Sequence, residues 1–212
     1  MKRIVVQFAV LATGALTLVG LGAVSSMLSG SEALVAVVED SVAVPVDSAS
    51  ALAAMSGELK ATQAELRRAH QILEFSTRYE IAADLAAAIY DHAVAEKIPP
   101  SLGFALVKLE SRFQNTATST AAAIGLTQLQ LPTARAYDPA VTRSDLMNRD
   151  VNLKIGFRYL RDLLHRFDND VALALEAYNK GPTLVAAQQE SGEEVRGKYS
   201  RAVLSGARRG AL

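Results

Sequence analysis

The clearest hydrophobic pattern in the chain is helical and covers residues 49–78. Apolar side chains recur there at helical spacings among charged residues, and Gly57 is the only helix breaker. The spacing predicts an amphipathic helix over 49–78, serving as a stalk or a short coiled coil. Its apolar positions are Leu52, Met55, Leu59, Leu66 and Leu73.

Further helical runs follow, each with a recognisable start or stop. Residues 79–97 are rich in alanine and end before a Pro-Pro pair, since a residue that precedes proline disfavours the helical region. Residues 115–120 are polar and loop-like, and no segment alternates with period two for long enough to require a sheet. The chain is therefore predicted to be all-α. Later helices are expected to begin near Pro100, Pro132, Asp150 and Asp170, with Gly181 and Pro182 closing the last.

The N-terminal segment is typical of a membrane-directed sequence. Lys2 and Arg3 precede residues 4–28, which carry no charge. A helix needs about 20 apolar residues to cross a bilayer, whereas a cleavable signal has about 7–15. Residues 1–30 are therefore expected to be a signal anchor, with a cleaved signal peptide as the alternative. In both cases the two basic residues leave the rest of the chain outside the cytoplasm.

Residues 31–48 mix valine, alanine, serine and acids around Pro45 without a sustained period, so they are predicted to be a linker. Half of the 212 residues are apolar, which is enough to bury a core. Lys plus Arg and Asp plus Glu both number 22, so no net charge recruits nucleic acid. The chain has no cysteine, which excludes disulfides, thiolate metal sites and cysteine nucleophiles.

The candidate for chemistry is Glu110, in the apolar run Leu102–Phe113. On a helical wheel it lies at the edge of the apolar face, so we expect it to be partly desolvated. Desolvation raises the pKa of a carboxylate, which can then hold a proton near neutral pH and deliver it to a leaving oxygen. Considered alone, a glutamate on a helix flank is more often an ordinary surface residue.

Two later polar signatures change this interpretation. Residues 125–128 read Gly-Leu-Thr-Gln and form a glycine-led turn, which can fold back over the cleft and offer backbone groups and an amide to sugar hydroxyls. Tyr178 and Asn179 precede a Gly-Pro helix end, and we expect the hydroxyl of Tyr178 to reach and orient the acid. In this order, an acid, an amide turn and a Tyr-Asn helix end indicate a saccharide cleft.

Four blocks of the chain resemble the soluble-lytic-transglycosylase-like domain family, which is related to goose-type lysozyme. The blocks are Ala105–Phe113, Ala123–Gln128, Asn152–Leu160 and Ala174–Pro182, with Tyr199 and Val203–Leu204 as a weaker final match. The resemblance implies a lysozyme-like helical globular domain at residues 79–205, preceded by the membrane segment and the amphipathic helix. Residues 206–212 would form a tail.

The resemblance also implies a reaction. Glu110 would protonate the oxygen between N-acetylmuramic acid and N-acetylglucosamine, then take the proton of the muramoyl C6 hydroxyl, which gives a 1,6-anhydromuramoyl end. Ser111 and Tyr178 would support the acid, while Gly125, Thr127, Gln128 and Asn179 would bind substrate. No metal and no cofactor are implied.

One departure from the family bears on the cleft. Relatives usually carry methionine where this chain has Thr127, so a large apolar side chain expected to line the cleft is replaced by a small hydroxyl.

The sequence is also compatible with two alternatives: a lysozyme-type hydrolase, which needs a water-activating base, and a non-catalytic peptidoglycan-binding scaffold of an envelope assembly. The expected partners are peptidoglycan glycan strands, the membrane through residues 4–28, and an envelope-complex partner through residues 49–78, with no nucleic acid. The expected location is the bacterial cell envelope, at the periplasmic face of the inner membrane, or secreted if the signal is cleaved.

Overall fold

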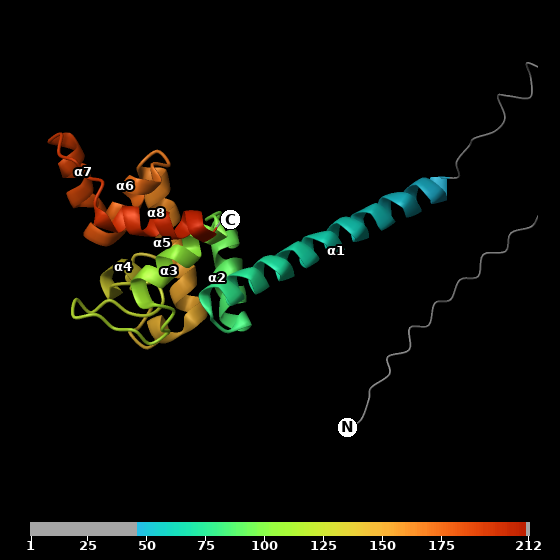
Figure 1. Cartoon of the computed structure of the whole chain (residues 1–212), viewed down its shortest axis with the longest axis horizontal. Coiled ribbons are helices and arrows are strands. Elements are labelled where there is room, and N and C mark those ends of the chain that lie inside the picture. Colours follow the sequence, from blue (N-terminus) through green and yellow to red (C-terminus); the bar gives the residue numbers. More distant parts are fainter. Residues whose placement is uncertain (1–45, 211–212) are drawn as a thin grey trace, which may run out of the picture. The chain divides into compact units, whose positions relative to one another are not determined.

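A computed structural model describes residues 46–210 of the chain (Figure 1). By contacts the chain divides into two compact units, Met1–Ala54 and Met55–Leu212. The described residues form helices and no named strand, which agrees with the all-α prediction. The helices are α1 (Val46–Tyr79), α2 (Ala83–Ala95), α3 (Pro100–Ser111), α4 (Leu131–Arg135), the 3-10 helix η1 (Asp145–Met147), α5 (Arg149–Arg166), α6 (Val171–Lys180), α7 (Pro182–Glu190) and α8 (Lys198–Gly210).

Helix α1 is longer than the amphipathic helix predicted from the sequence. It ends at Tyr79, and Glu80 follows with a left-handed φ of 54°. Its last turns belong to the core, because Ile72 and Phe75 are buried there and the Phe75 ring stacks on Phe104 of α3 at 4.1 Å between centroids. The end of the helix that was expected to be a separate stalk therefore contributes side chains to the globular core.

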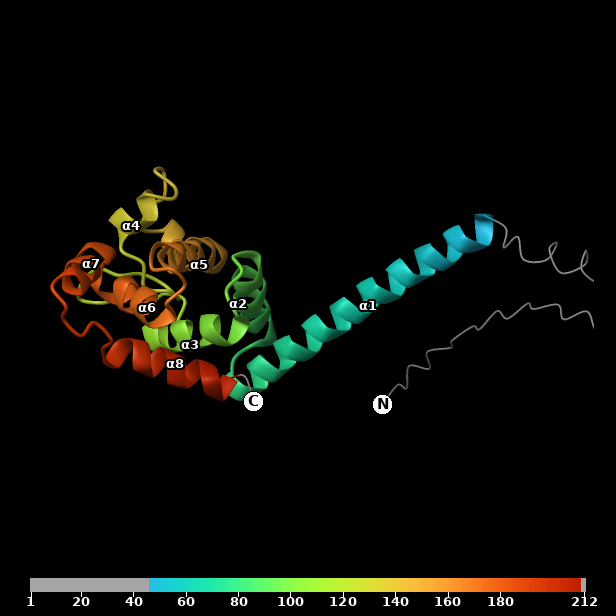
Figure 2. The same cartoon turned by 90° about the horizontal axis from the view of Figure 1, so that it is seen from above.

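Helices α3 and α8 lie side by side (Figure 2). Phe104, Leu106 and Val107 of α3 are fully buried, so this helix runs through the core. Helix α8 continues to Gly210, and Ala207 packs against the same core. Residues 206–210 are thus part of α8 and not the expected tail, because the apolar side of this helix extends beyond the last sequence match.

Local side chains set several helix ends that matter for the site. The Asp170 carboxylate accepts the N–H groups of Ala172 and Leu173 and caps α6, as the sequence predicted. Asn148 caps α5 in the same way, two residues before the predicted start. Helix α6 ends at Gly181, whose φ of 92° is a conformation that side chains rarely adopt. Asp170 and Gly181 thus set the two ends of α6, whose last turn carries Tyr178 and Asn179.

Among the helices described for residues 46–210, none combines the length and the hydrophobicity needed to cross a membrane. The predicted segments 1–30 and 31–45 lie outside the described residues, and residues 46–48 of the expected linker already belong to α1.

Candidate active site

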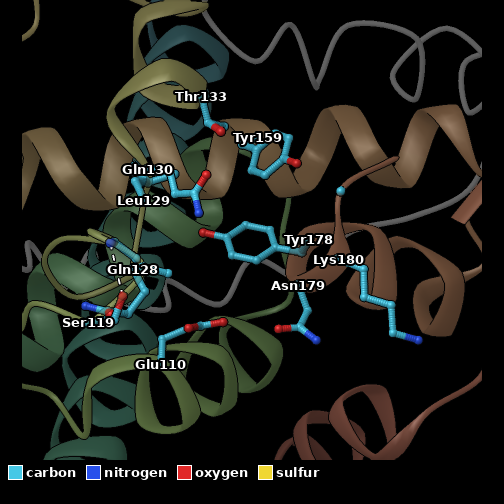
Figure 3. A pocket seen from close by; sticks show the side chains of 13 residues that line it. Glu110, Ser119, Gln128, Leu129, Gln130, Thr133, Tyr159, Tyr178, Asn179 and Lys180 are labelled. Carbon is cyan, nitrogen blue, oxygen red and sulfur yellow. Dashed lines mark hydrogen bonds between the residues drawn. The ribbon is translucent and has the colours of Figure 1, made fainter. Parts of the chain in front are cut away.

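A cleft of about 350 Å³ opens beside the C-terminal ends of α3 and α6 (Figure 3). Glu110 points into it from α3, and Tyr178 and Asn179 face it from α6. The loop before α4 supplies Gln128 and Ser119 on another side. Segments far apart in the sequence therefore meet at one polar cavity.

Glu110 occupies the last turn of α3, where that helix emerges from the core. Burial raises the pKa of its carboxyl above the ordinary value of 4.5, and a hydrogen bond from Tyr199 lowers it in part. Within residues 46–210, Glu110 is the only carboxylate that lines this cleft. The expectation of a partly desolvated acid at the edge of an apolar helix face is confirmed.

The hydroxyl that reaches Glu110 belongs to Tyr199, at the start of α8. Burial, followed by the charge of Glu110, raises the pKa of Tyr199 far above that of free tyrosine, so Tyr199 stays protonated and donates to the carboxylate. The two residues are 89 positions apart, and α8 brings them together by packing along α3. In the sequence, the only signal for Tyr199 was the weak final match to the family.

Glu176 anchors the N-terminal end of α8, a contact that no motif in the sequence indicated. It is fully buried, and its Oε1 accepts the N–H groups of Gly197 at 2.8 Å and Ser200 at 3.0 Å. Lys180 Nζ lies 2.9 Å from its Oε2. Burial raises the pKa of Glu176, but the donors from Ser200, Lys180 and Gly197 outweigh it, so that the pKa falls below its usual value. Since Ser200 adjoins Tyr199, the ionised Glu176 holds the turn that presents Tyr199 to Glu110.

The turn of residues 125–128 is fastened to α5 by Asn152. The Asn152 Oδ1 atom accepts from the backbone N and the hydroxyl of Thr127, both at 2.8 Å, and its Nδ2 donates to the carbonyls of Ile124 and Leu146. Gly125 has a φ of 77°, and a Cβ there would lie 2.3 Å from Asn152 Nδ2, so only glycine fits. The buried amide is fully used in holding this turn.

Thr127 does not line the cleft, which corrects the expectation from the sequence. Its side chain is fully buried and faces α5, where a Cβ added at Gly156 would lie 2.2 Å from Thr127 Oγ1. Gly125 likewise acts through its backbone conformation and does not line the cavity. Residues 125 and 127 therefore shape the turn, and Gln128 is the member of this motif that reaches the cavity.

The hydrogen bonds expected to support the acid also differ from prediction. The Tyr178 hydroxyl donates to the backbone carbonyl of Thr127 at 2.9 Å and so ties α6 to the turn, while Tyr199 bonds the acid. Ser111 is buried and its hydroxyl donates to the Val107 carbonyl within α3. Neither expected partner contacts Glu110 by a hydrogen bond, because the last turn of α3 directs Ser111 inward.

Gln128 and Asn179 are at the cleft as predicted. The Gln128 side chain donates from Nε2 to the carbonyls of Ala117 and Gly125, which holds the amide against its own turn. Asn179 is exposed at the opposite side. Across the described part of the chain, no group of three or more histidine, aspartate or glutamate side chains is placed to hold a metal ion.

Comparison with known proteins assigns the chain to a family. The model of the transglycosylase SLT domain family matches residues 86–200, which is more than half of the sequence. The chain belongs to the transglycosylase SLT domain family. The match includes Glu110, the Gly125–Gln128 turn, the end of α6 and Tyr199, so all parts of the cleft described above lie within the SLT domain.

Solved structures agree with this SLT assignment. An inactive mutant of the lytic transglycosylase Slt from Pseudomonas aeruginosa is 26% identical, with a TM-score of 0.54 over 59% of this chain and 23% of that one. The 70 kDa soluble lytic transglycosylase Slt70 from Escherichia coli is 24% identical, with a TM-score of 0.53 over 63% and 24% of the two chains, and shows the fold alone. The chain spans about a quarter of the length of each of these proteins.

Proposed function

We propose that this protein is a peptidoglycan lytic transglycosylase and that Glu110 is its catalytic acid and base. The observation that carries the proposal is the environment of Glu110: a desolvated carboxyl with a raised pKa, opening into a polar cleft and bonded to Tyr199. Membership of the SLT domain family and the likeness to Slt support the same activity.

In the first step, Glu110 gives its proton to the oxygen that bridges N-acetylmuramic acid and N-acetylglucosamine. The bond from this oxygen to the muramoyl C1 breaks and positive charge develops on the sugar ring. Burial raises the pKa of the Glu110 carboxyl, which favours the protonated form that a general acid requires. Tyr199 then stabilises the resulting carboxylate by donating a hydrogen bond to it.

In the second step, the carboxylate of Glu110 takes the proton of the muramoyl C6 hydroxyl, and the C6 oxygen closes on C1. The product is a 1,6-anhydromuramoyl end, no water is consumed, and Glu110 returns to its starting state. This route needs a single carboxylate, and among the described residues one carboxylate, Glu110, lines the cleft. The other acid on α6, Glu176, is fully buried and bonded to backbone N–H groups, so it is unsuited to activate a water for hydrolysis.

Gln128 and Asn179 flank the acid on two sides of the cleft and are proposed to bind the sugar hydroxyl and N-acetyl groups. Tyr178 supports the site indirectly, because its hydroxyl joins the end of α6 to the turn that carries Gln128. Ser111, Thr127 and Gly125 are proposed to act by holding α3 and the turn in place and not by touching substrate. Peptidoglycan as substrate places the domain in the cell envelope, with residues 4–28 as the proposed membrane anchor or signal.

The test is product analysis on purified peptidoglycan sacculi with the full chain, its Glu110→Gln variant and a matched control, Glu190→Gln. Glu190 is exposed at the end of α7 and does not line the cleft. We expect wild type and Glu190→Gln to release muropeptides with 1,6-anhydro ends and Glu110→Gln to release none above background. Mass spectrometry separates these products from hydrolysis products, which are heavier by one water.

Each alternative has its own outcome. Products heavier by one water would replace the lyase with a lysozyme-type hydrolase. Identical product profiles for wild type and Glu110→Gln would remove the enzyme assignment and favour a peptidoglycan-binding scaffold.

A further inference from the structure

One face of α1 carries large apolar side chains that the globular unit does not cover. Four leucines recur at seven-residue intervals, with a methionine between the first two, and all five side chains are between 58% and 66% exposed. We name this set the leucine stripe: Leu52, Met55, Leu59, Leu66 and Leu73. Scattered exposed leucines are ordinary in proteins, but a contiguous row along one helix marks an interaction surface.

The stripe faces away from the residues by which α1 contacts the globular unit. Those contacts include the stacking of Phe75 on Phe104, the burial of Ile72 and the ion pair of Arg68 with Asp91. Phe75 follows Leu66 by nine residues, which is about two and a half helical turns, so the two side chains point in opposite directions. A partner on the leucine stripe would therefore leave the packing of α1 on the globular unit undisturbed.

We propose that the leucine stripe pairs, in parallel, with the same stripe of a second copy of this chain. A straight α-helix has 3.6 residues per turn, so a strict seven-residue repeat drifts slowly around it. Two helices with this repeat keep their apolar residues in contact by winding round each other as a coiled coil. Leu52 to Leu73 spans about 30 Å at 1.5 Å per residue. A second copy carries an identical row at an identical spacing, so the surface is complementary to itself.

Charge beside the stripe selects the parallel direction. Glu58 and Glu65 each precede a leucine of the stripe and border the seam. In a parallel pair, Glu58 meets Gln63 of the second copy and Glu65 meets His70, so no like charges face each other. In an antiparallel pair that aligns the leucines, Glu58 of each copy meets Glu65 of the other, and both contacts are repulsive. Thr62 and Ala69, which fall between the leucines, are small enough to let the helices approach.

Cysteine cross-linking tests the pairing directly, because the full chain contains no cysteine of its own. Leu59→Cys and Leu66→Cys each place one thiol in the seam, and Ala64→Cys places one on the opposite, exposed side of the same helix as a matched control. With the full chain in mild detergent, we expect oxidation to convert most of each seam variant, and little of Ala64→Cys, to a disulfide-linked dimer. Equal cross-linking of all three variants would mean random collision and would overturn the proposal.

A mixture of Leu59→Cys with Leu66→Cys identifies the direction. Cross-links that form only in the mixture, and in neither variant alone, would show an antiparallel pair and overturn the parallel one.

Native mass of the uncross-linked chain provides the second measurement. We expect wild type at twice the 22.5 kDa of one chain and the double variant Leu59→Glu/Leu66→Glu at the single-chain mass. Both leucine side chains are exposed, so the double variant should keep the circular dichroism spectrum of wild type and release muropeptides at the same rate per mole of chain. A wild type at the single-chain mass would show that a second copy does not pair with the stripe, and a double variant that stays dimeric would show that another segment holds the copies together. Either result would overturn the proposal.

Discussion

Replacing Glu176 by alanine should destabilise the domain more than any other single change to a carboxylate near the cleft. The substitution removes the acceptor for the N–H groups of Gly197 and Ser200, at 2.8 and 3.0 Å, and leaves both donors at the start of α8 without their partner. It also removes the ion-pair partner of Lys180. All of this occurs at a side chain that is fully buried.

The magnitude follows from these contacts. A hydrogen bond to a charged acceptor contributes about 1.5–3 kcal/mol, and removing one partner of a buried ion pair costs about 3–5 kcal/mol. The Lys180 side chain is 32% exposed and can regain water, which places the loss at the lower end. We therefore expect Glu176→Ala to lower the free energy of unfolding by about 3 kcal/mol. For a chain of this size that corresponds to a fall in Tm of about 6–12 °C.

The assay is thermal unfolding followed by circular dichroism, with urea unfolding as the second measurement. Glu176→Gln keeps the volume and one acceptor oxygen and should lose about 1–2 kcal/mol. Glu110→Gln serves as the matched control, since burial disfavours the ionised form of Glu110 and its loss should not destabilise the fold at pH 7. If Glu176→Ala melts within 2 °C of wild type, Glu176 does not anchor α8, and another contact must hold Tyr199 beside Glu110.

Three further predictions concern Glu110, Tyr199 and Thr127. Tyr199→Phe removes the hydrogen bond that lowers the pKa of Glu110, so the pKa of Glu110 should rise and the alkaline limb of the pH–rate profile should move to higher pH. If kcat falls but the alkaline limb does not move, Tyr199 does not act through the pKa of Glu110. In the folded protein the pKa of Glu110 lies above its ordinary value of 4.5. The contribution of Glu110 to the free energy of unfolding is therefore fully present below pH 4.5 and is lost as the pH rises through the folded-state pKa. Glu110→Gln should therefore gain stability relative to wild type across this range, as measured by urea unfolding at a series of pH values, and a constant difference would contradict the raised pKa. Thr127→Met should lower the free energy of unfolding by about 1–3 kcal/mol, because the Thr127 side chain is fully buried against Gly156 and a larger one overpacks the interface. An undiminished Tm would mean that the turn can move away from α5.

The sequence by itself predicted much of the local structure and indicated Glu110 as the candidate acid. Helix starts at Pro100 and Asp170 and the helix end at Gly181 depend on nearest neighbours in the chain, so they could be predicted one segment at a time. The edge position of Glu110 on its own helix follows from the same periodicity, and the ordered motifs were enough to indicate the SLT domain family.

Only the tertiary structure decided which side chains serve the acid and which hold the site together. Tyr199 reaches Glu110 because α8 packs along α3, and Glu176 faces inward because the start of α8 lies over it. Thr127 points into the domain because Gly156 leaves room for it on α5. Each of these contacts joins elements that are distant in sequence, and periodicity within one helix carries no information about the helix that packs against it. For the same reason the motifs did not indicate that Phe75 of α1 is buried in the core or that Ala207 of α8 packs against it.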